Sequence, residues 1–483
     1  MSVDHPARRR LRGRPRRPAR AAVAGLAALA ALATASCQGG GTEGPGAPAS
    51  SDSAPTAPTS RAAAGTASDP VELTFAVYGE RAETASFRRV VDQYNAQVAS
   101  TQVRLETYDD RAALMAGLAA AETPPDLFLA SRRDLDAIVA DGLNTPLLEL
   151  LDERGVDYGD GYSRDALLSF SIEDDLQCMP YGLSPTVVYY NTDLIDFERM
   201  RARGLPAPST TLRGWTFESF AAAADVASRP RRDTRGVYVP PTLLGLAPFV
   251  YSGNGRLFDD ESDPTSLALS DDDARDALTR ALSLLRDPLV TLDEGQLENR
   301  TALQSFKQGR LGMITGTRAL TPRLRKVEGL SFDVMPMPVI GDQVTVGDIT
   351  GLCIGSGEEN VARTADFLVR MISDTAVAQV AREGYLVPAN LEVALSPDFL
   401  QLDQMPANSN IFNTSVRDLE ITPLIEPGTP LDDAVGEQVR ELFTVPGPLD
   451  DLDLRTQQID ETSRSVLDPT YVPEGSPSPT PSE

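Results

Sequence analysis

A regular alternation of strand and helix patterns opens the part of the chain that can form a core. Residues 71–77 (VELTFAV) alternate as a strand does, whereas residues 87–98 place apolar side chains at helical spacing. Residues 103–107 alternate again, residues 114–119 carry a second helical stripe, and residues 126–130 (DLFLA) form a short, mostly apolar strand. This β-α-β-α-β order predicts an α/β domain in which helices cover a parallel sheet.

The strand ends of this unit predict where a ligand binds. In open α/β sheets, ligands bind beyond the carboxyl ends of the strands. Three loops occupy those positions here: residues 78–81 (YGER), 108–110 (YDD) and 131–133 (SRR). We therefore take side chains of these loops as the first binding candidates.

The first residues of the chain predict export. Eight arginines lie between Arg8 and Arg20, and an alanine/leucine run covers residues 21–33. A basic start, a short apolar core and a small-residue exit are typical of a secretion signal, which we assign to residues 1–36. The apolar run is shorter than the about 20 residues that span a bilayer. Cys37 follows Ala35 and Ser36 and resembles the lipidated cysteine of a bacterial lipobox; an ordinary signal peptide with an incidental cysteine is the alternative.

Both ends of the chain beyond the folded body have a disordered composition. Residues 38–70 are dominated by Gly, Ser, Thr, Ala and Pro, and residues 469–483 alternate Pro with Ser and Thr near the end. Such segments cannot bury enough apolar surface to offset their ordering entropy. We predict a lipidated cysteine with a flexible tether over residues 37–70 and a disordered tail over residues 469–483.

Charge and histidine content exclude several functions. The formal net charge is −26, which disfavours nucleic acid because phosphate binding needs clustered Lys and Arg. The only histidine, His5, lies in the leader. Without histidine, Ser-His-Asp and Cys-His catalysis and most zinc sites are excluded. The acidic runs lack the spacing of a calcium loop, so we predict no metal and no cofactor.

Motifs further along the chain resemble one family. They are residues 124–127 (PPDL), 179–183 (MPYGL) with 188–194 (VYYNTDL), Pro206 with 214–220 (GWTFESF), 306–313 (FKQGRLGM) with Gly316, and 384–388 (GYLVP). In their order and spacing the chain resembles extracellular solute-binding proteins of the carbohydrate type (family 1), the capture components of ABC importers. The resemblance covers most of the body, whose nearly 400 residues already exceed one comfortable core.

The resemblance implies a two-lobed, periplasmic-binding-protein-like (type II) α/β fold. Each lobe would be a mostly parallel sheet flanked by helices, with hinge strands between the lobes. Lobe 1 would take residues 71–180 and a return segment of about 354–400. Lobe 2 would take residues 181–353 and C-terminal helices of about 401–468. We expect a monomer.

Two cysteines remain beyond Cys37. Cys178 and Cys353 each sit in a strand-like stretch, and an isolated pair in an exported protein is as readily bridged as free. The resemblance places both on neighbouring hinge strands, where a disulfide would restrict the hinge. Two buried free thiols are the alternative.

Ligand capture in the resembling family needs aromatic faces and hydroxyl-binding polar groups between the lobes. The aromatic candidates are Tyr78, Tyr181, Phe249, Tyr251 and Tyr385, and the polar candidates are Glu80, Asp109, Ser131, Asn254, Arg318 and Asp348. Each tyrosine has a core residue as its alternative, and Asn254 has a tight turn or hairpin. Trp215 is better explained by packing at a helix start.

The resemblance therefore predicts a solute-binding lipoprotein on the outer face of the cell membrane. It would capture a sugar-like solute and deliver it to ABC permease subunits, without enzymatic activity. Two alternatives stay open at this point: a sensing or adhesion lipoprotein on the same fold, and a glycoside hydrolase that uses two carboxylates.

Overall fold

The first sheet begins as the sequence pattern predicts. In the computed structural model, β1 (Val71–Tyr78), β2 (Thr101–Tyr108) and β3 (Leu127–Ser131) alternate with α1 (Arg81–Gln97) and α2 (Arg111–Ala120). Strand β1 pairs in parallel with both β2 and β3. The structure describes residues 69–261, 263–357, 359–422, 425, 429–444 and 451–471. The predicted leader, Cys37 and most of the predicted tether and tail lie outside these residues.

The remaining strands of the lobe 1 sheet come from distant parts of the chain. The sheet order is β14-β7-β13-β3-β1-β2, in which β7 is Met179–Leu183, β13 is Ile349–Gly355 and β14 is Val387–Pro388. Strand β13 pairs antiparallel with both β3 and β7. The sheet is therefore mixed rather than mostly parallel, because β13 enters directly from the other lobe instead of through a crossover helix.

Lobe 2 contains a second, smaller sheet. Its order is β11-β8-β10-β9, with β8 at Val187–Asn191, β9 at Arg235–Tyr238, β10 at Leu311–Gly316 and β11 at Phe332–Met335. Only β9 and β10 pair in parallel, since β8 is antiparallel to both of its neighbours. The expectation of a mostly parallel sheet is thus corrected here too, while the two-lobed α/β class holds.

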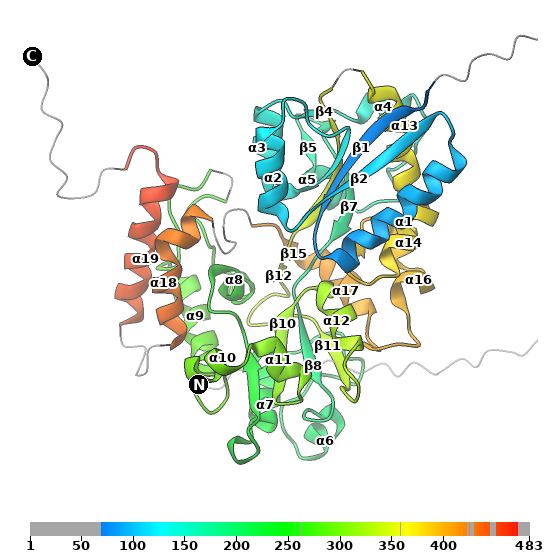
Figure 1. The fold of residues 1–483 in the computed structure, drawn as a ribbon. Helices are drawn as coiled ribbons and strands as arrows, with labels where there is room; N and C mark the ends of the chain where they lie inside the picture. Colours follow the sequence, from blue (N-terminus) through cyan, green and yellow to red (C-terminus); the bar gives the residue numbers. More distant parts are fainter. Residues whose placement is uncertain are drawn as a thin grey trace, which may run out of the picture. The chain divides into compact units, whose positions relative to one another are not determined.

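Helices cover both sheets, and the last two belong to lobe 2. In lobe 1, α13 (Val361–Met371) and α14 (Asp374–Ala381) pack against α1. In lobe 2, α18 (Pro430–Thr444) and α19 (Leu452–Leu467) pack on each other and on α9 (Asp272–Leu285). Figure 1 shows α18 and α19, in orange and red, beside α9. The other helices of four or more residues are α3 (Leu135–Ala140), α4 (Leu148–Asp152), α5 (Arg164–Ser169), α6 (Phe197–Ala202), α7 (Phe217–Ala227), α8 (Leu243–Ser252), α10 (Glu294–Asn299), α11 (Ala302–Lys307), α12 (Thr321–Arg325), α15 (Leu391–Ala394), α16 (Pro397–Leu400) and α17 (Asn410–Ser415).

Short strands complete the architecture near the lobe boundary. Strand β12 (Thr345–Val346) pairs in parallel with β15 (Leu419–Glu420), and β4 (Asn144–Thr145) joins the end of β13. Strands β5 (Ser171–Ile172) and β6 (Asp175–Leu176) form a hairpin ahead of β7.

Two chain segments cross between the lobes side by side, and we call them the hinge segments. They are residues 184–186, which follow β7, and residues 346–348, which precede β13. The amide of Ser184 donates to the carbonyl of Asp348 at 2.9 Å, and that of Thr186 donates to the carbonyl of Val346 at 2.9 Å. A Cβ on Gly347 would collide with the carbonyl oxygen of Ser184, so glycine permits this close approach.

A disulfide ties the two strands that lead into the hinge segments. Cys178, just before β7, is bonded to Cys353 of β13, and their Cα atoms are 4.4 Å apart. Of the two alternatives left open by the sequence, the structure therefore holds the bridged one. The bond fixes β7 against β13 within lobe 1.

Aromatic packing fills lobe 2 around the chain's one tryptophan. Trp215 is 4% exposed, and its indole N–H donates to the carbonyl of Pro336 at 2.9 Å. Its ring makes edge contacts with Phe197 and Phe220. The prediction that Trp215 packs at a helix start is confirmed, since α7 begins two residues later.

Candidate functional site

The carboxyl ends of β1 and β3 meet the hinge at a hydrogen-bonded pair. Ser131, the last residue of β3, donates its hydroxyl to both carboxylate oxygens of Asp348 at 2.9 and 2.8 Å. Arg133, two residues after Ser131, donates to the carbonyl of Gly347 at 3.1 Å and lies 4.0 Å from the Asp348 carboxylate. The edge of the lobe 1 sheet is thereby held directly against a hinge segment.

Tyr78, the last residue of β1, lies among these carboxylates. Burial is the main reason that its pKa is well above the ordinary value, and the negative charges of Asp348 and Asp134 raise the pKa further. Its hydroxyl therefore stays neutral and available as a hydrogen-bond donor. Asp134 is itself ion-paired with Arg111, at the start of α2.

The first turn of α1 contributes two more carboxylates. Glu80 precedes α1 and forms an ion pair with Arg323 of α12, a residue of lobe 2. Glu83 lies one turn further, and burial raises its pKa to about 7. Gly79, which precedes both residues, adopts a φ of 129°, and a Cβ there would lie 2.6 Å from the Glu83 carboxylate. Only glycine suits this turn, which brings both carboxylates to the sheet edge.

These side chains form one group, which we call the carboxyl-edge cluster. Tyr385 joins it, because burial and then the charges of Glu80 and Glu83 raise the pKa of its phenol. The members are Tyr78, Glu80, Glu83, Arg111, Ser131, Arg133, Asp134, Arg323, Asp348 and Tyr385. Five of the predicted ligand residues are among them: Tyr78, Glu80, Ser131, Asp348 and Tyr385. Asp109 lies on the β2–α2 turn at the same sheet edge and is exposed.

Three predicted ligand residues are core residues and need correction. Tyr181 is 1% exposed and packs against Phe87 in lobe 1. Phe249 is fully buried in lobe 2, with its ring against that of Phe217. Side chains this deeply buried offer no surface to a ligand in this structure.

Arg318 is the third correction and the most unusual. Its side chain is fully buried, 4.0 Å from the centroid of the Phe399 ring, and it donates to the Phe399 carbonyl at 2.7 Å. A second ring, that of Phe412, lies 5.1 Å away. Burial lowers the pKa of this guanidinium to about 10. Arg318 thus holds the later segments against lobe 2 by cation–π contacts instead of meeting a ligand.

The remaining two predicted residues lie at the end of α8. The hydroxyl of Tyr251 donates to the carboxylate of Glu261 at 3.0 Å and accepts from Thr422, just beyond β15. Asn254 is exposed at φ 67°, in the turn that ends α8. The tight turn predicted for Asn254 is present, but it ends a helix and does not form a hairpin.

Four of the ten cluster residues escaped prediction from sequence. Arg111, Asp134 and Glu83 each lie a few residues beyond a strand end that the sequence did identify, so extending the three loops by one helical turn finds them. Arg323 had no signal, because it reaches Glu80 across 243 residues of chain.

A separate cavity of about 420 Å³ also lies against the hinge strands. The residues that line it include Leu183 of β7, Pro388 of β14, Tyr162, Asn413 and Arg417. We call it the hinge cavity. It offers a second place of suitable size for a small solute.

No group of three or more His, Cys, Asp or Glu side chains in the described part of the chain is placed to hold a metal ion. None of the helices described is long and apolar enough to cross a membrane.

A two-lobed α/β body with a polar sheet edge at its hinge defines a solute-binding fold. Residues 89–407 match the family model of bacterial extracellular solute-binding proteins. Since the match covers more than half of the chain, the protein belongs to that family, whose members are binding proteins. No curated protein sequence is similar to the chain at a significant level.

Solved structures share the fold at low sequence identity. An ABC substrate-binding protein of Listeria monocytogenes, in complex with cycloalternan, has a TM-score of 0.67 and 16% identity, covering 82% of this chain and 98% of its own. The maltose-bound MalE3 of T. maritima has a TM-score of 0.64 and 14% identity, with 82% and 100% covered. The GacH receptor of Streptomyces glaucescens, solved unliganded and with acarbose, has a TM-score of 0.62 and 17% identity, with 81% and 99% covered.

Proposed function

We propose that the protein captures a sugar or sugar derivative at the carboxyl-edge cluster and delivers it to an ABC-type importer. The observation that carries the proposal is the gathering of Tyr78, Glu80, Ser131 and Asp348 at one sheet edge beside the hinge. Carboxylates and hydroxyls bind sugar hydroxyls, and tyrosine rings cover C–H faces. The structural neighbours named above were solved with cycloalternan, maltose and acarbose, which supports a carbohydrate ligand.

The hinge gives this cluster a means of capture. The Glu80–Arg323 ion pair joins the two lobes at the cluster, and both side chains are well exposed. A sugar entering here exchanges that pair for hydrogen bonds from its hydroxyls to Glu80 on one lobe and Arg323 on the other. Asp348 lies in a hinge segment, so ligand contacts are coupled directly to lobe closure.

Binding should therefore depend on the cluster and not on the hinge cavity. We expect titration calorimetry with maltooligosaccharides, monosaccharides and polyols to reveal one sugar class that binds. Asp348→Asn and Glu80→Gln should each weaken that binding by roughly tenfold or more, since each removes a charge-assisted hydrogen bond.

Two matched controls make the experiment decisive. Asp366→Asn removes a carboxylate of lobe 1 that is 2.8 Å from Arg154 on the outside of α13, and it should leave affinity within about twofold. Arg417→Gln tests the hinge cavity. Loss of sugar binding in Arg417→Gln with retention in Asp348→Asn would move the site to that cavity, and no binding by any carbohydrate would refute the proposal.

We further propose that residues 1–36 direct export and that Cys37 carries the lipid anchor on the outer face of the membrane. The leader composition and the tether that follows support this arrangement. Mass spectrometry of the membrane fraction should find a diacylated cysteine at residue 37. Cys37→Ala should shift the protein to the medium, and unchanged membrane retention of that variant would contradict the anchor.

A further inference from the structure

A large cavity on lobe 2, separate from the carboxyl-edge cluster, is lined by arginines. Its volume is about 1000 Å³, and it lies between the turn after β8, helix α6 and the end of α7. Five arginines line it: Arg199, Arg203, Arg229, Arg231 and Arg232. We call this cavity the arginine pocket.

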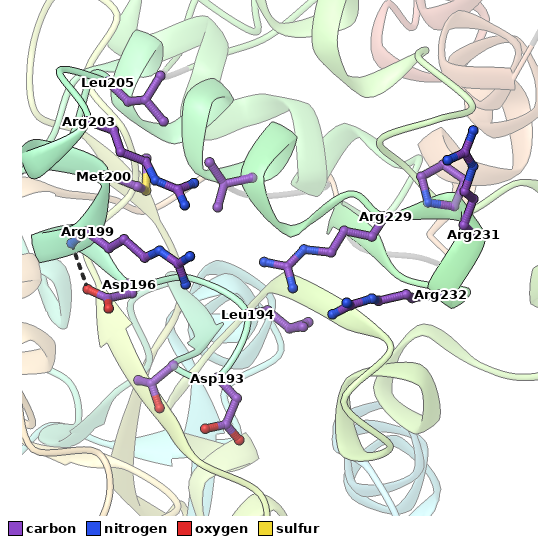
Figure 2. Close-up of a pocket in the computed structure, with 13 residues that line it drawn as sticks. Asp193, Leu194, Asp196, Arg199, Met200, Arg203, Leu205, Arg229, Arg231 and Arg232 are labelled. Carbon is purple, nitrogen blue, oxygen red and sulfur yellow. Dashed lines mark hydrogen bonds between the residues drawn. The ribbon is translucent and has the colours of Figure 1, made fainter.

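Four of the five guanidinium groups converge on the same space. Figure 2 shows Arg199 and Arg203 reaching in from one side, and Arg229 and Arg232 from the other. The side chain of Arg231 points away from them. Since Arg199 and Arg203 are four residues apart on α6 and its C-cap, the helix presents both on one face.

None of these guanidinium groups forms an ion pair or hydrogen bond with any residue that the structure describes. Two aspartates line the pocket, but Asp196 caps α6 by accepting from the amide of Arg199 at 2.9 Å. Asp193 makes no ion pair with these arginines either. Other arginines of the described chain do form ion pairs, as Arg154 does with Asp366 at 2.8 Å.

The fold itself does not neutralise this charge. The four converging arginines and the two aspartates leave two positive charges in the pocket. The carboxyl ends of α6 and α7 supply roughly half a negative charge each. About one net positive charge remains at this site in a protein of net charge −26, where four guanidinium groups face one another despite their mutual repulsion. A concave site of this kind suits a small polyanion better than a flat protein surface does.

We propose that the arginine pocket is a second binding site, for a ligand bearing phosphoryl groups. Guanidinium groups bind phosphoryl oxygens through paired N–H donors, and several converging arginines are typical of such sites. The volume exceeds that of one phosphate ion, so the ligand carries more than one phosphoryl group or a phosphorylated organic moiety. A soluble phosphorylated molecule and a phospholipid headgroup offer the same chemistry.

Pyrophosphate is the probe for the soluble arm. We expect calorimetric binding to the purified protein that weakens as salt is raised. The double variant Arg199→Gln/Arg229→Gln should lose about tenfold or more in affinity, because two charge-assisted donors are removed. Arg231→Gln is the control, which removes one positive charge from a side chain directed elsewhere, and should stay within about twofold.

Vesicles provide the lipid arm. Sedimentation with phosphatidylglycerol vesicles, but not phosphatidylcholine vesicles, that is competed by pyrophosphate and lost in Arg199→Gln/Arg229→Gln would identify the headgroup as the source. Pyrophosphate binding without sedimentation would identify a soluble ligand. Binding of neither probe, or equal losses in Arg231→Gln and the double variant, would overturn the proposal. Sugar binding plays no part in either readout, so the proposed solute capture can fail or succeed independently.

Discussion

Arginine is used in opposite ways in the carboxyl-edge cluster of lobe 1 and in the arginine pocket of lobe 2. In the cluster, Arg111 binds Asp134, Arg323 binds Glu80, and Arg133 lies 4.0 Å from Asp348. In the pocket, the guanidinium groups have no carboxylate partner among the described residues.

Burial explains the difference. The side chain of Arg133 is 7% exposed, and a buried charge must be paired because the low-dielectric interior penalises it otherwise. All but one of the pocket arginines are exposed, so water solvates them and the fold needs no partner for them. The buried charge of Arg133 is thus compensated by the fold, whereas the exposed, uncompensated charge of the pocket is left for a ligand from outside.

The strongest test of this contrast removes the disulfide beneath the cluster. Cys178→Ser/Cys353→Ser should lower the free energy of unfolding by about 2–5 kcal/mol, because the bond closes a loop of 175 residues. Urea denaturation measures the loss, and dithiothreitol should reproduce it in the unmodified protein but not in the variant. Pyrophosphate affinity should be unchanged wherever the variant stays folded. A matching loss of that affinity would show that the two regions are not independent.

Substituting a single carboxylate in each region provides the next test of the contrast between them. Asp134→Asn removes the charge that pairs with the partly buried Arg111 and should lower the free energy of unfolding by about 2 kcal/mol, between the values for exposed and buried pairs. Asp193→Asn in the pocket is the counterpart and should change it by less than about 0.5 kcal/mol. Equal losses of stability in the two variants, measured by chemical denaturation, would contradict the distinction between compensated and uncompensated charge.

The sequence was sufficient to predict the cluster residues that lie at the strand ends. Strand ends close to Tyr78 and Ser131 follow from the alternation of residues 71–77 and the apolar run of residues 126–130, and the carboxyl-end rule places their loops at the ligand edge. Contacts between distant segments were not accessible in this way. Nothing near Arg318 in the sequence shows that Phe399 covers it, just as nothing near Phe249 shows Phe217 against its ring. Core and ligand aromatics have the same local pattern, and only the tertiary fold distinguishes them.

The stability of lobe 1 should depend on pH through the titration of Glu83. Burial raises the pKa of Glu83 in the folded protein to about 7, above the ordinary value of 4.5. The folded state therefore binds the extra proton, and the free energy of unfolding falls as the pH rises through this interval.

Glu83→Gln should abolish that part of the pH dependence. It should match the unmodified protein at pH 4 and exceed its stability at pH 8 by roughly 3 kcal/mol. Urea midpoints at the two pH values provide the measurement. Glu437→Gln, on an exposed side chain of α18, should leave the profile unchanged. An unaltered slope in Glu83→Gln would show that Glu83 does not titrate in this range.

The smallest effect on stability is expected at the pair that joins the lobes. The Arg323 and Glu80 side chains are 40% and 49% exposed, so Arg323→Gln should change the free energy of unfolding by less than about 0.5 kcal/mol. Sugar affinity should nevertheless fall several-fold in calorimetry, because one lobe loses its contact with the ligand. A large loss of stability with unchanged sugar affinity would show that Arg323 stabilises the fold and does not contact the ligand.

The position of β13 also sets the order in which the lobes can be completed during synthesis. This strand lies between β7 and β3 in the first sheet, although residues 349–355 follow most of lobe 2 in the chain. A ribosome must therefore make three-quarters of the protein before the N-terminal lobe can close its sheet. Until then, the edges of β3 and β7 remain unpaired, and contacts of such long range form slowly. Such a delay would suit the export that we propose for this chain, because the first lobe cannot complete its fold before residue 355 has been made.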